Sequence, residues 1–243
     1  MSHVKSVRGG GPAAPGGSAT RFAVAAARSA KWITFAALAG AQACLAGELS
    51  VAVVDRAGRG VDDAVVTVAP LAPSASHPAT APRTAVMDQR DRAFVPRVLV
   101  ISAGTSVEFP NNDSVSHQVY SFSAAKKFQL PLYKGARHPP VTFERPGLVV
   151  LGCNIHDEMV GYILVTDAPF YGTTDATGSL TLAGLPAGEY RVTVWSPMIA
   201  DPAASLTRTV RVEATAATSD RVQLARDLRA RPEPRPRRGD WEY

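Results

Sequence analysis

The sequence predicts an all-β protein made of two β-sandwiches. Short runs rich in Val, Ile, Phe and Tyr recur along the chain, and turn-forming Gly, Pro, Asn and Asp residues separate them. No long amphipathic helical pattern interrupts this series. Once an N-terminal leader is set aside, about 197 residues remain, which is enough for two small β-domains with cores of their own.

The first 46 residues have the charge pattern of an export signal. They contain five Lys or Arg residues and no Asp or Glu, and about fifteen mostly apolar residues follow Lys31. This apolar run is shorter than the roughly twenty residues of a membrane-spanning helix, so we expect cleavage without stable membrane insertion. Small residues at 41–46 place the start of the mature chain near Cys44 or Gly47. The sequence thus predicts a periplasmic protein with residues 1–46 as its signal peptide.

The leader also changes what the net charge of +5 means. Five of the 26 Lys and Arg residues lie in the leader, which leaves 21 against 21 Asp and Glu. A nearly neutral mature protein does not favour nucleic acid as a partner. The remaining basic cluster lies in the proline-rich segment 224–243, whose composition predicts a disordered tail. Docking of this tail to an acidic partner is the alternative.

Eleven segments of the mature chain have the composition of β-strands, and a Pro, Ala and Ser-rich linker is predicted at 71–83. The predicted strands are residues 49–54, 64–69, 97–101, 106–110, 117–122, 141–144, 148–152, 161–166, 179–185, 190–195 and 206–213.

Cys153 is the residue that most needs a chemical explanation. The other cysteine, Cys44, lies in or beside the leader, so the mature chain has no partner for an internal disulfide. A lone thiol in an oxidising compartment is a liability unless it is deeply buried or bound to a metal. The residues around Cys153 favour the metal.

Cys153, His156 and Met159 lie within seven residues, on what the sequence predicts to be one turn between two strands. His117 follows a polar turn and opens a predicted strand, so it can supply a second imidazole at the same end of the sandwich. One Cys, two His and a weak axial Met describe a blue-copper site, whereas zinc favours tetrahedral sets of several Cys or His ligands. Glu158 is the alternative axial ligand and would give a different copper centre. His77 and His138 have no comparable context.

These motifs resemble the plastocyanin and amicyanin group of cupredoxins, which fold as Greek-key β-sandwiches. The segment FVPRVLVISAGTSVEFPNND is similar to the group's second and third strands, and VGYILV is similar to its last strand. The resemblance covers residues 84–167, and Cys-x2-His-x2-Met is the compact ligand-loop spacing of amicyanin. It implies one copper ion, cycling between Cu(II) and Cu(I), with the ligands His117, Cys153, His156 and Met159.

Two further details qualify this resemblance. The string CNIHD is similar to a subgroup labelled methylamine-utilisation proteins, a label that establishes no methylamine pathway here. Gln118 follows the first ligand where familiar members have an Asn, whose amide ties the two ligand loops together. Either Gln118 or Asn154 is the candidate for this tie.

The segment TTDATGSLTLAGLPAGEYRVTVWSP resembles carboxypeptidase-regulatory-like and collagen-adhesin B-type repeats. Those repeats normally begin with a strand pair like that of residues 53–68, which the copper domain here separates from the rest. We therefore predict a discontinuous prealbumin- or Ig-like sandwich of residues 48–70 and 168–223, into which the cupredoxin domain is inserted. Two consecutive domains, with 48–83 as extra strands, are the alternative.

The sequence thus predicts a type 1 copper protein that carries single electrons between protein redox partners and is not an enzyme. His156, on the predicted exposed loop, is the expected point of electron exchange. A copper storage, delivery or interaction module is the first alternative. A copper enzyme with Glu158 or water as a ligand is the second.

Overall fold

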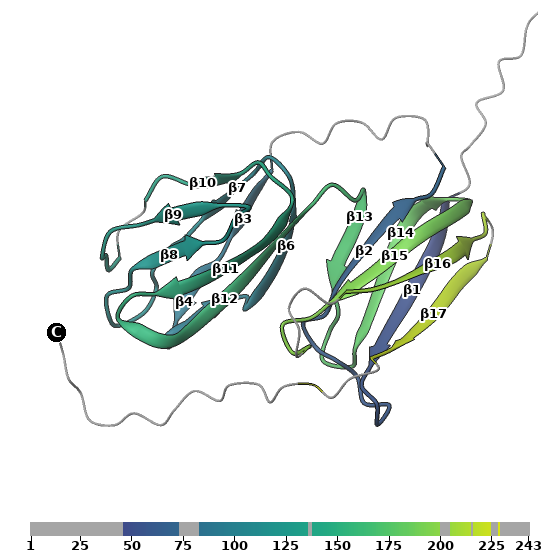
Figure 1. The fold of residues 1–243 in the computed structure, drawn as a ribbon, viewed down its shortest axis with the longest axis horizontal. Coiled ribbons are helices and arrows are strands. Elements are labelled where there is room, and N and C mark those ends of the chain that lie inside the picture. The colour runs from purple at the N-terminus through teal and green to yellow at the C-terminus, as the bar shows by residue number, and fades with distance from the viewer. Residues whose placement is uncertain are drawn as a thin grey trace, which may run out of the picture. The chain divides into compact units, whose positions relative to one another are not determined.

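The computed structural model describes residues 46–72, 83–135, 138–199, 205–214, 216–224 and 228. Within these ranges the secondary structure consists of strands β1 to β17 without a helix, which confirms the all-β fold class (Figure 1). No helix of membrane-spanning length and apolarity occurs in this part of the chain. Residues 1–45 of the predicted signal peptide, most of the linker at 71–83 and nearly all of the tail lie outside the described residues, whereas Ala46 opens β1.

Strands from both ends of the described chain build a first β-sandwich. One sheet has the order β14-β1-β17 and the other β13-β2-β15-β16. In the first sheet β1 is central, antiparallel to β14 and parallel to β17. The bounds are β1 Ala46–Val54, β2 Val65–Pro70, β13 Phe170–Thr173, β14 Ser179–Pro186, β15 Gly188–Trp195, β16 Leu206–Val212 and β17 Ala217–Gln223.

The core of this sandwich forms because alternate apolar residues on the facing strands point inward. Leu49 and Val51 of β1, Val66 of β2 and Val192 of β15 are all buried in one cluster. The early strands β1 and β2 are therefore packed among strands that follow residue 169, as the colours in Figure 1 show.

Strands β3 to β12 form a second group with a core of its own. A five-stranded sheet has the order β6-β12-β11-β8-β9, a three-stranded sheet has the order β10-β7-β3, and β4 pairs with β5. The bounds are β3 Thr84–Val86, β4 Asp88–Arg90, β5 Ala93–Val95, β6 Val98–Ser102, β7 Thr105–Glu108, β8 Val119–Phe122, β9 Lys127–Gln129, β10 Val141–Phe143, β11 Gly147–Cys153 and β12 His156–Thr166. The buried cluster of this group includes Phe94, Val107, Phe143, Cys153 and Met159.

Two local predictions around the candidate ligands are wrong. The predicted single turn carrying Cys153, His156 and Met159 is a two-residue connection, because β11 continues to Cys153 and β12 already begins at His156. The predicted strand 117–122 begins at Val119, and His117 instead forms an isolated bridge with Tyr133. Cys153 and His156 therefore stand at the facing ends of two paired strands, Met159 lies within β12, and His117 is held by its bridge to Tyr133.

Candidate metal centre

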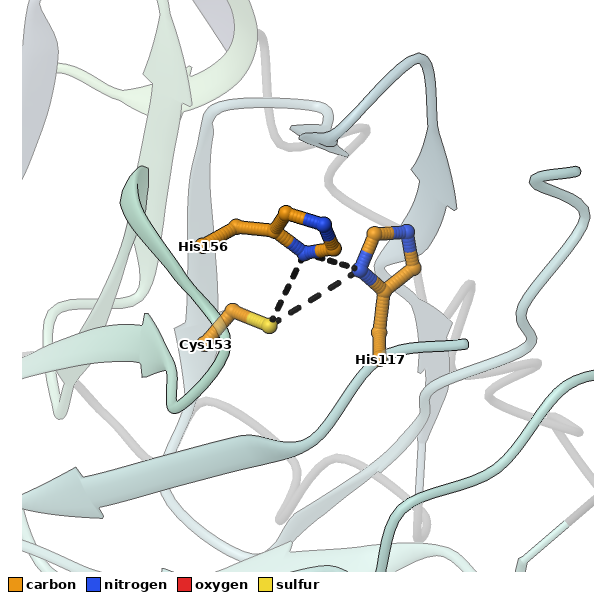
Figure 2. Close-up of side chains that lie close together, drawn as sticks. All are labelled: His117, Cys153 and His156. Carbon is orange, nitrogen blue, oxygen red and sulfur yellow. Dashed lines mark hydrogen bonds between the residues drawn. The ribbon is translucent and has the colours of Figure 1, made fainter. Parts of the chain in front are cut away.

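The structure brings three of the four predicted ligands together. The Nδ1 atoms of His117 and His156 lie 3.1 Å apart, and the Sγ of Cys153 lies 3.7 Å from the former and 3.6 Å from the latter. Figure 2 shows both imidazole rings turned toward this sulfur atom. Among the described residues, these three are the one group of His, Cys, Asp or Glu side chains whose donor atoms all lie within 4.8 Å of one another.

The size of this triangle fits a metal ion at its centre. Bonds of about 2.0–2.1 Å to nitrogen and 2.3 Å to sulfur place two nitrogen donors about 3.3–3.6 Å apart and a nitrogen and a sulfur about 3.5–3.8 Å apart. The observed separations agree with these values to within a few tenths of an ångström. His117, Cys153 and His156 can therefore hold a metal ion.

Main-chain and amide hydrogen bonds hold His117 in place. Its N–H donates to the carbonyl of Tyr133, and the Tyr133 N–H donates back to the His117 carbonyl, both at 3.0 Å. The Asn111 amide donates to the carbonyls of Tyr133 and Val115, which closes the polar turn before the histidine. Because His117 is 0% exposed, its ring has little freedom to leave the site.

Main-chain contacts tie Cys153 to the segment that carries His117. Cys153 pairs with Val119 at the end of the β8–β11 ladder, and the Asn154 N–H donates to the Gln118 carbonyl at 3.2 Å. The tie between the two ligand segments, which the sequence assigned to a Gln118 or Asn154 side chain, is thus made by their main chains. This bond is independent of the side chain at position 118.

The surroundings of Cys153 favour the thiolate. Burial raises the pKa of the thiol, but its hydrogen-bond contact with His117 and hydrogen bonds from the backbone N–H groups of Gln118 and Ile155 outweigh burial and lower the pKa overall. Burial lowers the pKa of His117, yet its hydrogen bonds to Cys153 and Asp113 raise it overall. The thiolate is the form of cysteine that binds metals, so these contacts prepare the sulfur for ligation.

His156 is the candidate ligand that reaches the surface. Its side chain is half-buried, and the adjoining Ile155 is 47% exposed. Burial lowers the pKa of His156, and the positive charges of His117 and Arg92 act in the same direction. A neutral imidazole is the form that donates to a metal ion.

Asp113 is a site residue that the sequence analysis missed. Its Oδ2 lies 2.9 Å from the Nε2 of His117, and the two side chains are 5% and 0% exposed. Burial raises the pKa of Asp113, but hydrogen bonds from the Arg92 N–H, His117 and the Ser114 N–H lower it to about 2. The sequence places Asp113 four residues before His117, but an aspartate in this polar turn is also explained by turn formation alone.

The remaining candidates are placed as follows. Met159 is 1% exposed and belongs to the same buried cluster as Cys153, whereas Glu158 is exposed. His138 packs its ring against Tyr133 and takes no part in the three-residue group. His77 lies outside the described residues.

No family model and no curated protein matches this chain. Among solved structures the chain is similar to a purple cupredoxin from Nitrosopumilus maritimus, with 27% identity and a TM-score of 0.31. That match covers 34% of this chain and 99% of the purple cupredoxin chain. A copper-containing nitrite reductase from Thermus scotoductus SA-01 is 31% identical over 40% of this chain and 25% of its own, with a TM-score of 0.32. A reduced amicyanin mutant is 20% identical over 41% of this chain and 99% of its own, also at 0.32. The match therefore spans only a quarter of the nitrite reductase chain.

Proposed function

We propose that this protein is a type 1 copper protein that carries single electrons between redox partners. The observation that carries the proposal is the triangle of the Cys153 sulfur and the two Nδ1 atoms of His117 and His156, because its size and its donors both suit copper.

The donor set favours copper over zinc. Structural zinc sites close a tetrahedron with four Cys or His ligands, and the group formed by the described side chains contains three such residues. Two imidazoles and one thiolate in a trigonal arrangement, completed by a weak axial thioether, are the ligands of electron-transfer copper.

Met159 is the fourth donor in this proposal. Its side chain is buried in the same cluster as the Cys153 thiol, while the neighbouring Glu158 is exposed. Successive residues of a strand point to opposite faces, so Met159 and Glu158 of β12 project to opposite sides. Burial therefore favours the thioether over the carboxylate as the axial ligand.

Bound copper would supply a one-electron couple between Cu(II) and Cu(I). The protein's part is to keep the donors in one arrangement in both states. Hydrogen bonds of the main chain fix the segments of His117 and Cys153, and burial restricts the side chains of both. The half-buried His156 provides the route by which a redox partner would exchange the electron.

We propose a periplasmic location on the basis of the leader at residues 1–46, and a protein redox partner on the basis of the proposed electron transfer. The proposal assigns electron transfer rather than turnover because three protein donors and Met159 leave no ligand position for a substrate. Copper storage or delivery is the second candidate, since soft thiolate and thioether donors also retain Cu(I).

The test is the visible and electron-spin-resonance spectrum of the mature protein with Cu(II), followed by repeated cycles of reduction and reoxidation. We expect an intense thiolate-to-copper band that is lost in Cys153→Ser and shifted in Met159→Leu. Met87→Leu is the matched control because Met87 is equally buried in the same cluster, and it should leave the spectrum unchanged.

Retention of copper through the cycles would support the electron carrier, whereas loss of the metal on reduction would support storage or delivery. A colourless complex that neither Cys153→Ser nor Met159→Leu affects would refute the blue-copper site.

A further inference from the structure

A carboxylate lies behind the more deeply buried of the two histidines. The Oδ2 atom of Asp113 is 2.9 Å from the Nε2 of His117, on the side of the ring away from the Nδ1 that faces Cys153. Both side chains are almost wholly removed from solvent. An ionised acid buried at this distance interacts far more strongly than one exposed to water, so it must affect what the imidazole does.

Other hydrogen bonds hold this carboxylate in place. The Oδ2 atom also accepts the backbone N–H of Arg92 at 2.7 Å, and Oδ1 accepts the N–H of Ser114 at 2.6 Å. The N–H of Asp113 itself donates to the Asn111 side chain at 2.9 Å. The carboxylate therefore cannot turn away from His117 without breaking several hydrogen bonds.

The Arg92 contact comes from a turn with unusual geometry. Asp91 and Arg92 join β4 to β5 in a two-residue loop, and both have positive φ, 49° and 57°. Turns of this kind favour Asn, Asp or Gly, so Arg92 is the residue strained by the left-handed conformation. This turn places the Arg92 N–H against the Asp113 carboxylate.

We propose that Asp113 is a positioning residue for the metal centre, which holds the proton of His117 on Nε2 and thereby leaves the Nδ1 lone pair for copper. This inference rests on the proposed copper function. A ligating histidine whose other nitrogen donates to a carboxylate has a fixed ring orientation and is a stronger donor. The negative charge also stabilises Cu(II) more than Cu(I), so Asp113 lowers the reduction potential of the site.

The experiment compares Asp113→Asn and Asp113→Glu with the wild type. The Asn variant keeps the shape and loses the charge, and we expect its Cu(II) affinity to fall about ten- to a hundred-fold. Its Cu(I) affinity should fall less, and each tenfold difference between the two losses corresponds to a rise of about 59 mV in the reduction potential. The Glu variant retains the charge and should lie nearer the wild type. In the apo protein, ¹⁵N resonances should show the Nε2–H form of neutral His117, and this preference should weaken in Asp113→Asn.

Asp55→Asn is the matched control. Asp55 also accepts a hydrogen bond from the side chain four residues later, Arg59, and its side chain is 11% exposed, but it belongs to the first sandwich. If Asp113→Asn changes the affinities and the potential no more than Asp55→Asn does, or if the apo His117 is protonated on Nδ1, the inference is overturned. A wild-type protein that forms no thiolate-to-copper band would instead overturn the proposed function, and this inference with it.

Discussion

The Nδ1 atoms of His117 and His156 lie closer to each other, at 3.1 Å, than either lies to the Cys153 sulfur. The two rings differ in their surroundings: the Nε2 of the buried His117 faces the Asp113 carboxylate, whereas His156 is half-buried. As candidate metal ligands the two histidines are therefore not equivalent.

The two histidines should therefore differ in how their loss can be repaired. In His156→Gly the vacated position adjoins solvent, and added imidazole should restore the thiolate-to-copper band of the Cu(II) protein. His117→Gly should not be restored, because His117 is 0% exposed and its loss also removes one hydrogen-bond partner of the buried Asp113 carboxylate. Titration of each Cu(II) variant with imidazole in the visible range measures the difference. Equal recovery of the two variants would contradict the assignment of His156 as the accessible ligand.

Met159 should have a packing role that is separable from ligation. In the apo protein, Met159→Ala should lower the free energy of unfolding by about 2–5 kcal/mol, because it leaves a cavity in the buried cluster. Met159→Leu conserves the volume and should cost less than about 1.5 kcal/mol. Urea unfolding measures both values. Glu158→Gln is the exposed neighbouring control, and a loss in that variant as large as in Met159→Ala would contradict the opposite placement of the two side chains.

The sequence predicts several apolar strands well, predicts only the second half of the longest strand, β12, and predicts the short polar strands poorly. The run predicted at 148–152 is β11, and the run at 190–195 is β15, each extended by only a few residues. The three-residue strands β4 and β9 have the sequences DQR and KFQ, which carry no alternating apolar pattern. Such strands form because neighbouring strands offer them hydrogen bonds, and that information does not lie in their own residues.

The candidate site likewise contains residues that the sequence identifies and one that only the fold reveals. His117, Cys153 and His156 could be selected from the sequence because soft and borderline donors at this spacing have few other uses. That they bind copper stays a prediction, as does the role of Met159. Asp113 could not be selected in the same way, because an aspartate in a polar turn is ordinary turn chemistry. Only the folded chain brings its carboxylate to the buried face of His117.

Gly161 should be essential for the packing of β5 against β12. A Cβ atom at this position would lie 2.8 Å from Cδ2 and 2.9 Å from Cβ of Phe94, which is buried. Since the Cβ of Phe94 moves only with its backbone, Gly161→Ala should lower the free energy of unfolding by about 1–3 kcal/mol. Gly188→Ala is the control, because its nearest neighbour would be 3.8 Å away. Urea unfolding that leaves Gly161→Ala as stable as Gly188→Ala would disprove this close approach.

Asp88 should make the stability of the apo protein depend on pH in acid. Burial raises the pKa of this carboxyl, but hydrogen bonds from Asn112, the Gln89 N–H and Arg90 outweigh burial and hold the pKa below its ordinary value of 3.8. A carboxyl whose pKa is lower in the folded state binds its proton more readily in the unfolded state. Its contribution to stability is thus fully present above the unfolded pKa and is lost as the pH falls through the folded pKa.

Asp88→Asn should therefore have a lower free energy of unfolding than the wild type at about pH 6. This difference in free energy, the gap, should narrow as the pH falls from about 5 to 2. Urea unfolding of both apo proteins across this range measures the gap. Glu189→Gln is the control, because Glu189 is an exposed carboxylate of β15, and its gap to the wild type should stay small throughout. A gap for Asp88→Asn that stays constant between these pH values would show that Asp88 stabilises the fold by its shape and hydrogen bonds rather than by its charge. A gap that narrows only for Asp88→Asn would assign the acid sensitivity to the carboxylate at the start of β4, three residues before the turn that supports Asp113.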